Sequence, residues 1–133
     1  NEYKIPTKIP FGEYGGSSVE YHGYEIDVLS AEGNRFTVNR KLNPKLILKR
    51  GNTYYFDQSL KDNVNYPLRF SASKDGTHSG GDEYREGVAV NGLPGKRGSY
   101  VKITVADNAP DRLYLYCSRQ IGMAGNGVVA VKD

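Results

Sequence analysis

RLYLYCSRQIGMAGNGVVAV, residues 112–131, decides the fold of this chain. It begins with RLYLYC, in which polar or aromatic side chains alternate with apolar ones, and it ends with VVAV, a short apolar run rich in β-branched residues. Both patterns are typical of β-strands. Alternation places Leu113, Leu115 and Cys117 on one face, which we expect to point inward. The connection between the strands begins after the single cysteine and contains the single methionine, Met123. This pair of sulfur ligands raises the question of a metal site.

The rest of the chain continues the β pattern. Glycine and tyrosine are abundant (16 and 11 residues), and no window shows the apolar periodicity of an amphipathic helix. Short apolar or alternating runs between turn residues predict strands at 24–29, 35–38, 45–49, 53–58, 67–72, 100–105, 112–117 and 127–131. Seven or eight strands in 133 residues predict an all-β domain, either a two-sheet sandwich or a closed barrel.

Local signals place side chains and turns within this pattern. In the predicted strand 67–72 and the residue before it, one face carries Tyr66, Leu68, Phe70 and Ala72, and the opposite face carries Arg69 and Ser71. Gly51 is suited to the positive φ of a tight turn after 45–49. The stretch 73–98 is long for a loop, and we expect short elements inside it, one of them at 88–90.

Composition limits the classes of function. The length fits one domain, the 38% hydrophobic content fits a water-soluble fold, and no apolar run is long enough to span a membrane. The net charge of +3 is small and scattered, so no nucleic-acid partner is expected. Lys45 and Lys49 flank an apolar triplet, and we interpret them as charges that protect a strand from aggregation. One cysteine permits no internal disulfide.

The first 18 residues read differently from the rest. Residues 1–18 combine Pro6 and Pro10 with a later run of glycine and serine, which predicts an extended N-terminal arm followed by a hinge. The domain itself is then expected at 19–133. The opening NEYKIP lacks an initiator methionine and a signal segment, so we interpret the chain as a processed form or a piece of a longer one.

Four segments, LILKRGNTYYFD, YPLRFS, APDRLYLYC and GMAGNGVVAV, occur in an order that resembles the cupredoxin-like domains, the β-sandwich family of plastocyanin and azurin. The resemblance covers about residues 21–133 and implies a two-sheet Greek-key β-sandwich. In copper-binding members of that family, two histidines, a cysteine and a methionine form the site. Imidazoles and a thiolate bind copper in a trigonal arrangement, with the thioether on the axis.

This sequence departs from the family at both histidines. Tyr66 stands where the first is expected and Gln120 where the second is expected, while Cys117 and Met123 remain. A phenol and an amide are poor copper ligands. We therefore expect no metal and no cofactor, with the two sulfur side chains buried as core and the Tyr66 hydroxyl bonded to a partner such as Gln120.

The remaining polar clusters give weaker signals. His78 and His22 are the two histidines of the chain and therefore the candidates to replace a missing ligand. Asp75, Asp82 and Glu83 lack the spacing of a calcium loop. Ser79, His78 and Asp82 are neighbours in one loop and do not form a rigid catalytic triad. We expect no enzyme activity.

The leading hypothesis is a non-enzymatic structural or interaction module of an extracellular assembly. Divergent domains resembling this one in bacterial surface proteins and phage particles imply a cell-surface or virion setting. The expected partners are protein subunits, in a homo-oligomer or a larger assembly, joined by strand addition of the arm. The arm residues expected to make this contact are Tyr3, Lys4, Ile9, Pro10 and Phe11.

Three alternatives stay open. A copper electron carrier would need other ligands in place of the missing imidazoles. A glycan- or surface-binding module would use exposed tyrosines. The arm would have no role if it is only a loose terminus.

Overall fold

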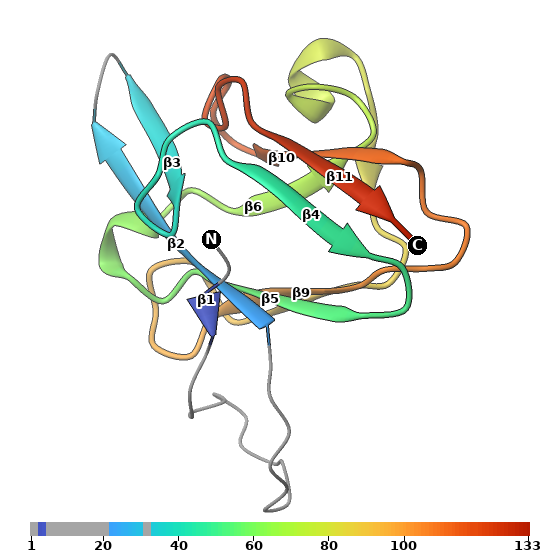
Figure 1. The fold of residues 1–133 in the computed structure, drawn as a ribbon. Coiled ribbons are helices and arrows are strands. Elements are labelled where there is room, and N and C mark those ends of the chain that lie inside the picture. Colours follow the sequence, from blue (N-terminus) through green and yellow to red (C-terminus); the bar gives the residue numbers. More distant parts are fainter. Residues whose placement is uncertain (1–2, 5–21, 31–32) are drawn as a thin grey trace, which may run out of the picture.

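The computed structural model describes residues 3–4, 22–30 and 33–133, and these form two stacked β-sheets (Figure 1). The first sheet contains β1 (Tyr3–Lys4), β2 (His22–Ser30), β3 (Asn34–Val38), β5 (Thr53–Asp57), β8 (Val88–Asn91) and β9 (Tyr100–Thr104). The second contains β4 (Lys45–Lys49), β6 (Leu68–Ser71), β7 (Glu83–Tyr84), β10 (Arg112–Cys117) and β11 (Val128–Lys132). Two 3₁₀ helices, η1 (Lys61–Asn63) and η2 (Gly76–Ser79), lie in connections.

The chain alternates between the two sheets. The order is β1-β2-β5-β9-β8 in the first sheet, with β3 also on β2, and β4-β11-β10-β6-β7 in the second. Most neighbours are antiparallel, but β2 with β5 and β4 with β11 are parallel. Between the two strands of each parallel pair, the chain passes through the other sheet. The predicted all-β fold and its two-sheet Greek-key sandwich are confirmed, and the closed barrel is excluded.

The eight predicted strands all form, and 45–49 and 112–117 have the predicted bounds. The short strand expected at 88–90 is also present, as β8. The two-residue strands β1 and β7 were not predicted, because two residues are too few to show a period.

Aromatic side chains from both sheets meet in the core. Phe56 on β5 stacks on Tyr24 of β2, with 4.9 Å between ring centroids, and meets the edge of Phe70 on β6 at 5.3 Å. Leu113, Leu115 and Cys117 on β10 are buried in the same core, as the alternation predicted. Packing of these rings across the two sheets fixes the spacing of the sandwich.

The outer face of β6 and β10 is covered where alternation predicts exposure. Tyr116 and Ser71 point away from the core yet are buried. The reason is the connection containing η2, which folds over them: Ser71 Oγ donates to the Asp82 carbonyl at 2.6 Å, and Gly76 lies against the Tyr116 ring. Ala72, expected inward, is exposed because β6 ends at Ser71.

β4 is an edge strand of the second sheet. Leu46 and Leu48 are buried, while Lys45, Ile47 and Lys49 are exposed, with Ile47 67% exposed. Two lysines on an edge strand disfavour pairing with foreign strands. This location agrees with their interpretation as protective charges.

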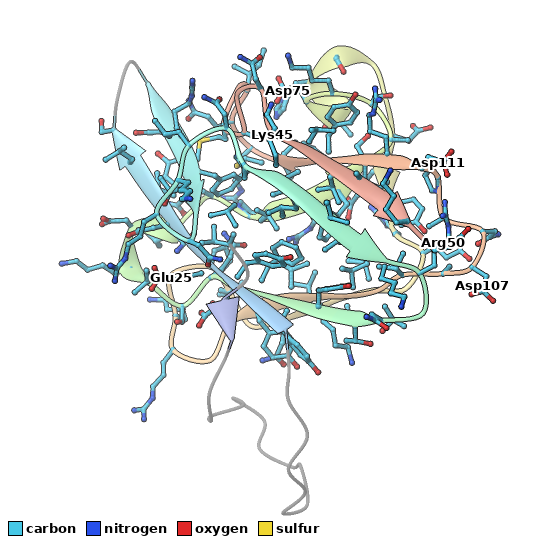
Figure 2. The ribbon with its side chains drawn as sticks, viewed as in Figure 1. Glu25, Lys45, Arg50, Asp75, Asp107 and Asp111 are labelled. Carbon is cyan, nitrogen blue, oxygen red and sulfur yellow. The ribbon has the colours of Figure 1, made fainter. Side chains whose placement is uncertain are left out.

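The turn after β4 is tied to the ends of β10 and β11 (Figure 2). Gly51 adopts φ +90° as expected, and Arg50 donates to the Ala109 carbonyl at 2.7 Å. Arg50 also pairs with Asp111 at 2.8 Å and with Asp133 at 3.0 Å. The hydrogen bond to Asp111, the largest contribution, raises the pKa of the guanidinium. Both carboxylates are 93% exposed, so we expect little stability from this cluster.

Part of the N-terminal arm belongs to the first sheet. Tyr3 pairs with Gly23 and Lys4 with His22, as a two-residue antiparallel strand on β2. The other predicted arm contacts, Ile9, Pro10 and Phe11, lie outside the described residues, and so does the predicted boundary at residue 18.

Candidate functional site

The two sulfur side chains lie in the core. Cys117, the last residue of β10, and Met123, in the connection to β11, are both 0% exposed and belong to one hydrophobic cluster. The connection is held against β3, because the Phe36 N–H donates to the Met123 carbonyl at 2.7 Å. Their burial matches the predicted core-filling role.

The Cys117 thiol is in an environment that favours its neutral form. Burial, the largest influence, raises its pKa above the ordinary value. Backbone N–H groups of Arg119 and Gln120 act in the opposite direction, as do the charges of Arg119 and Arg69. Because burial prevails, the raised pKa favours the neutral thiol, which is a poor nucleophile.

Tyr66 is half-buried and packs against the same cluster. Its hydroxyl accepts a hydrogen bond from Asn34 Nδ2 at 2.6 Å. The expected partner was Gln120, but Asn34 at the start of β3 takes this role. Gln120 is half-buried in the connection after Cys117. The structure therefore brings Tyr66, Cys117 and Met123 to one hydrophobic cluster.

His78 lies near Cys117 but contacts its backbone. His78 Nε2 is 2.7 Å from the Cys117 carbonyl oxygen, so the imidazole donates there, and its ring meets Tyr116 edge-on at 6.2 Å. His78 belongs to η2, one of the short elements inside the stretch 73–98. The nitrogen nearest Cys117 is occupied by a proton and a carbonyl, and is therefore not available to a metal.

The donor set does not fit the copper site that the resemblance implies. Such a site needs two imidazoles facing one thiolate. Tyr66, bonded to the Asn34 amide, stands at the first of these positions, and Gln120 stands at the second. The main-chain pairs of His22 are with Lys4 and Tyr54 in the first sheet. Within residues 3–4, 22–30 and 33–133, His, Cys, Asp and Glu form no group of three that is suited to a metal ion.

The residues of the dismissed calcium and hydrolase patterns have structural roles. Both Asp75 carboxylate oxygens lie 3.1 Å from the Gly122 N–H, which joins the η2 connection to the one after Cys117 (Figure 2). Glu83 pairs with Arg69 at 3.6 Å and Arg85 at 3.3 Å. Ser79 Oγ donates to the carbonyls of Lys74 and Gly76, so it does not face His78 as a nucleophile would.

A buried amide network beside Tyr66 was missed by the sequence reasoning. Gln58 is 2% exposed; its Nε2 donates to Asn63 Oδ1 at 3.0 Å and to the Tyr66 carbonyl at 2.8 Å, and its Oε1 accepts from the Leu68 N–H at 2.9 Å. Asn63 Nδ2 continues the network to the Ile26 carbonyl at 2.8 Å. The sequence signal for this network is Gln58 itself, a polar residue directly after the aromatic strand TYYFD. This signal does not identify its hydrogen-bond partners.

Comparison with known proteins yields structural likeness only. No protein-family model matches the chain, and no curated protein does. Reduced rusticyanin is 17% identical with a TM-score of 0.46, over 87% of this chain and 82% of that one. Two crystal structures of substituted rusticyanins are each 16% identical, with TM-scores of 0.44 and 0.45 over 91% and 93% of this chain and 86% and 88% of theirs. No ligand or activity is taken from these likenesses.

Proposed function

We propose that this domain is a metal-free, non-enzymatic interaction module that assembles by strand addition. In the assembly, the N-terminal strand of one copy pairs with β2 of a neighbouring copy. The setting is extracellular, on a cell surface or in a virion. The observation that carries the proposal is β1, which adds antiparallel to β2 through Tyr3 and Lys4.

The edge of β2 is suited to such exchange. β3 pairs with β2 over Ile26–Ser30, and β1 pairs at Gly23 and His22. Two residues of pairing contribute few hydrogen bonds, and the same bonds form whether the strand comes from the same copy or from another. Exchange of identical elements between copies is a low-cost route to oligomers. The exposed backbone of a sheet edge accepts a strand without a tailored pocket.

The candidate site supports the metal-free, non-enzymatic part of the proposal. Cys117 is a neutral buried thiol, Tyr66 is bonded to Asn34, and His78 is bonded to a backbone carbonyl. None of these groups is paired as a nucleophile and base are in an enzyme. The described residues include no helix with the length and apolar character needed to cross a membrane.

The test is the mass in solution of the full chain and of a variant lacking residues 1–18. We expect the full chain to form an oligomer and the shortened chain to be a monomer with an unchanged circular dichroism spectrum. Ile47→Lys is the matched variant, because it adds charge to β4, an edge strand of the second sheet. An oligomer that survives the deletion but dissociates with Ile47→Lys would place the interface at β4 and overturn the proposal.

A further inference from the structure

Three connections converge on a hollow of about 540 Å³ at one end of the sandwich. The connection after η1 contributes Val64 and Pro67, and the segment after β10 contributes Ser118 and Arg119. The β8–β9 turn contributes Gly92, Leu93, Pro94 and Lys96. Figure 1 shows the η1 segment (green) and the β8–β9 turn (light orange) at the same end of the sheets. The volume lies in the usual range for ligand-binding sites, about 300–1,000 Å³. We call this hollow the basic groove.

Two walls of the basic groove are fixed by the amide network. Gln58 holds the segment from Asn63 to Leu68 through its side chain, and its carbonyl accepts from the Gly95 N–H at 2.7 Å. Gly95 packs so closely that an added Cβ would lie 2.8 Å from Val64. Because one wall is bonded to the buried side chain of Gln58 and the other to its main-chain carbonyl, the groove is formed before any ligand binds. Preformed sites lose less ordering entropy on binding.

The charges of the groove are all of one sign. Lys96 and Arg119 are exposed cations, and neither forms an ion pair within the described parts of the chain. Arg69 also lines the groove, but Glu83 at 3.6 Å neutralises part of its charge. Among the described residues that line the groove, none is acidic. Two cations with no counter-charge in this part of the chain favour an anionic ligand.

Apolar side chains lie at the rim beside these cations. Leu93 is 68% exposed and Val64 is 44% exposed, and Pro67 and Pro94 continue the apolar surface. A small molecule enclosed in a pocket would leave such rim residues in water. Exposed apolar side chains with arginine and polar neighbours are typical of surfaces that bind other proteins.

We propose that the basic groove binds an acidic polypeptide segment of a partner protein. An apolar side chain of that segment covers Leu93 and Val64, and flanking carboxylates pair with Lys96 and Arg119. A nucleic acid fits less well, because the lining residues that the structure describes include no aromatic side chain on which a base could stack, and two of them are cations without an ion pair. The proposal goes beyond strand addition and does not depend on it, since the described residues that line the groove all lie between Val64 and Arg119.

The probe is the peptide acetyl-Glu-Leu-Asp-Leu-Glu-amide, and its uncharged analogue acetyl-Gln-Leu-Asn-Leu-Gln-amide is the control. Binding to the full chain is followed by amide chemical shifts in solution. We expect the acidic peptide to shift residues 64–69, 92–96 and 118–121, and added salt to weaken the binding. The uncharged analogue should bind at least about tenfold more weakly, since it loses both charge pairs.

Substitutions separate specific binding from general attraction. Lys96→Glu with Arg119→Glu should weaken binding of the acidic peptide by at least about tenfold. Lys45→Glu with Lys132→Glu changes the net charge equally, at exposed positions that do not line the groove, and should change the affinity by less than about twofold. Leu93→Ser should weaken binding by about threefold through lost apolar contact.

Three results would overturn the proposal. The first is the absence of localised shifts with the acidic peptide at low salt. The second is equal weakening by the two charge-reversal pairs, which would indicate nonspecific attraction. The third is tighter binding of a single-stranded oligothymidylate to the same residues. Removal of residues 1–18 should leave peptide binding intact, so failure of the arm proposal and failure of this one are distinguishable.

Discussion

The side-chain amide of Asn34 donates to the phenol oxygen of Tyr66 at 2.6 Å and joins two segments that lie 32 residues apart in sequence. Tyr66 occupies the position where the cupredoxin-like resemblance expects a histidine. The hydrogen bond gives this phenol a structural role. It links the start of β3 to the entry of β6, next to the cluster that contains Cys117 and Met123.

Tyr66→Phe should lower the free energy of unfolding by about 0.5–1.5 kcal/mol, because it leaves the partly buried Asn34 amide without its acceptor. Chemical denaturation measures this change, and a double-mutant cycle with Asn34→Ala should show that the two residues are coupled. Tyr84→Phe is the control. Its buried hydroxyl has no hydrogen-bond partner among the described residues, so its removal should cost nothing. Equal losses at both tyrosines would contradict the assigned role of Asn34.

Tyr66→His combined with Gln120→His should create cupric binding with an intense visible charge-transfer band. The reason is that the two imidazoles would join the retained thiol and thioether of Cys117 and Met123. Metal analysis and visible absorption measure the result, and the unsubstituted chain should remain colourless. Adding Cys117→Ser should abolish the band. A folded, colourless double variant would show that these positions do not face one another as the resemblance implies.

Stability should fall with rising pH above about 9.0, the ordinary pKa of a thiol. Burial raises the pKa of Cys117 in the folded chain, so above this pH the unfolded chain loses the proton while the folded chain keeps it. The stabilisation is therefore complete below pH 9.0 and is lost as pH rises through the folded pKa. Tyr84, Tyr100 and Tyr116, whose pKa values burial also raises, contribute a slope of the same sign that grows as pH approaches 10.0. Comparison with Cys117→Ala between pH 9.0 and 10.0 therefore isolates the thiol: the variant should have a smaller slope there, and an unchanged slope would assign it to the other groups.

Gly76→Ala should destabilise the fold more than Gly80→Ala. Both glycines have positive φ, +55° and +88°, so each substitution carries a backbone cost of about 1–2 kcal/mol. At Gly76 an added Cβ would also lie 2.6 Å from the Tyr116 ring, whereas at Gly80 nothing lies within 4 Å. Overpacking adds about 1–3 kcal/mol. The difference in thermal or chemical unfolding between the two variants measures how tightly η2 closes over Tyr116, and equal effects would indicate a loose cover.

Local sequence pattern determined the strands and the class of fold. Alternation in KLILK and RLYLYC, and turn residues such as Gly51, act between near neighbours, so they can be read without knowledge of the partner strand. The sequence also showed that neither position where the resemblance expects a copper-ligand histidine carries one, because this concerns residue identity alone. The burial of Cys117 and Met123 followed from the same reasoning.

Tertiary structure alone decided which polar groups meet. Asn34 rather than Gln120 binds Tyr66, His78 binds the Cys117 carbonyl, and Gln58 ties together two connections that form the basic groove. These contacts join residues far apart in the chain, and a hydrogen bond forms only when packing brings donor and acceptor within about 3 Å. No periodicity encodes such distances. The sequence therefore determined the sandwich fold and the absence of both ligand histidines. The way the connections fold over the ends of the sandwich determined the surface available to partners.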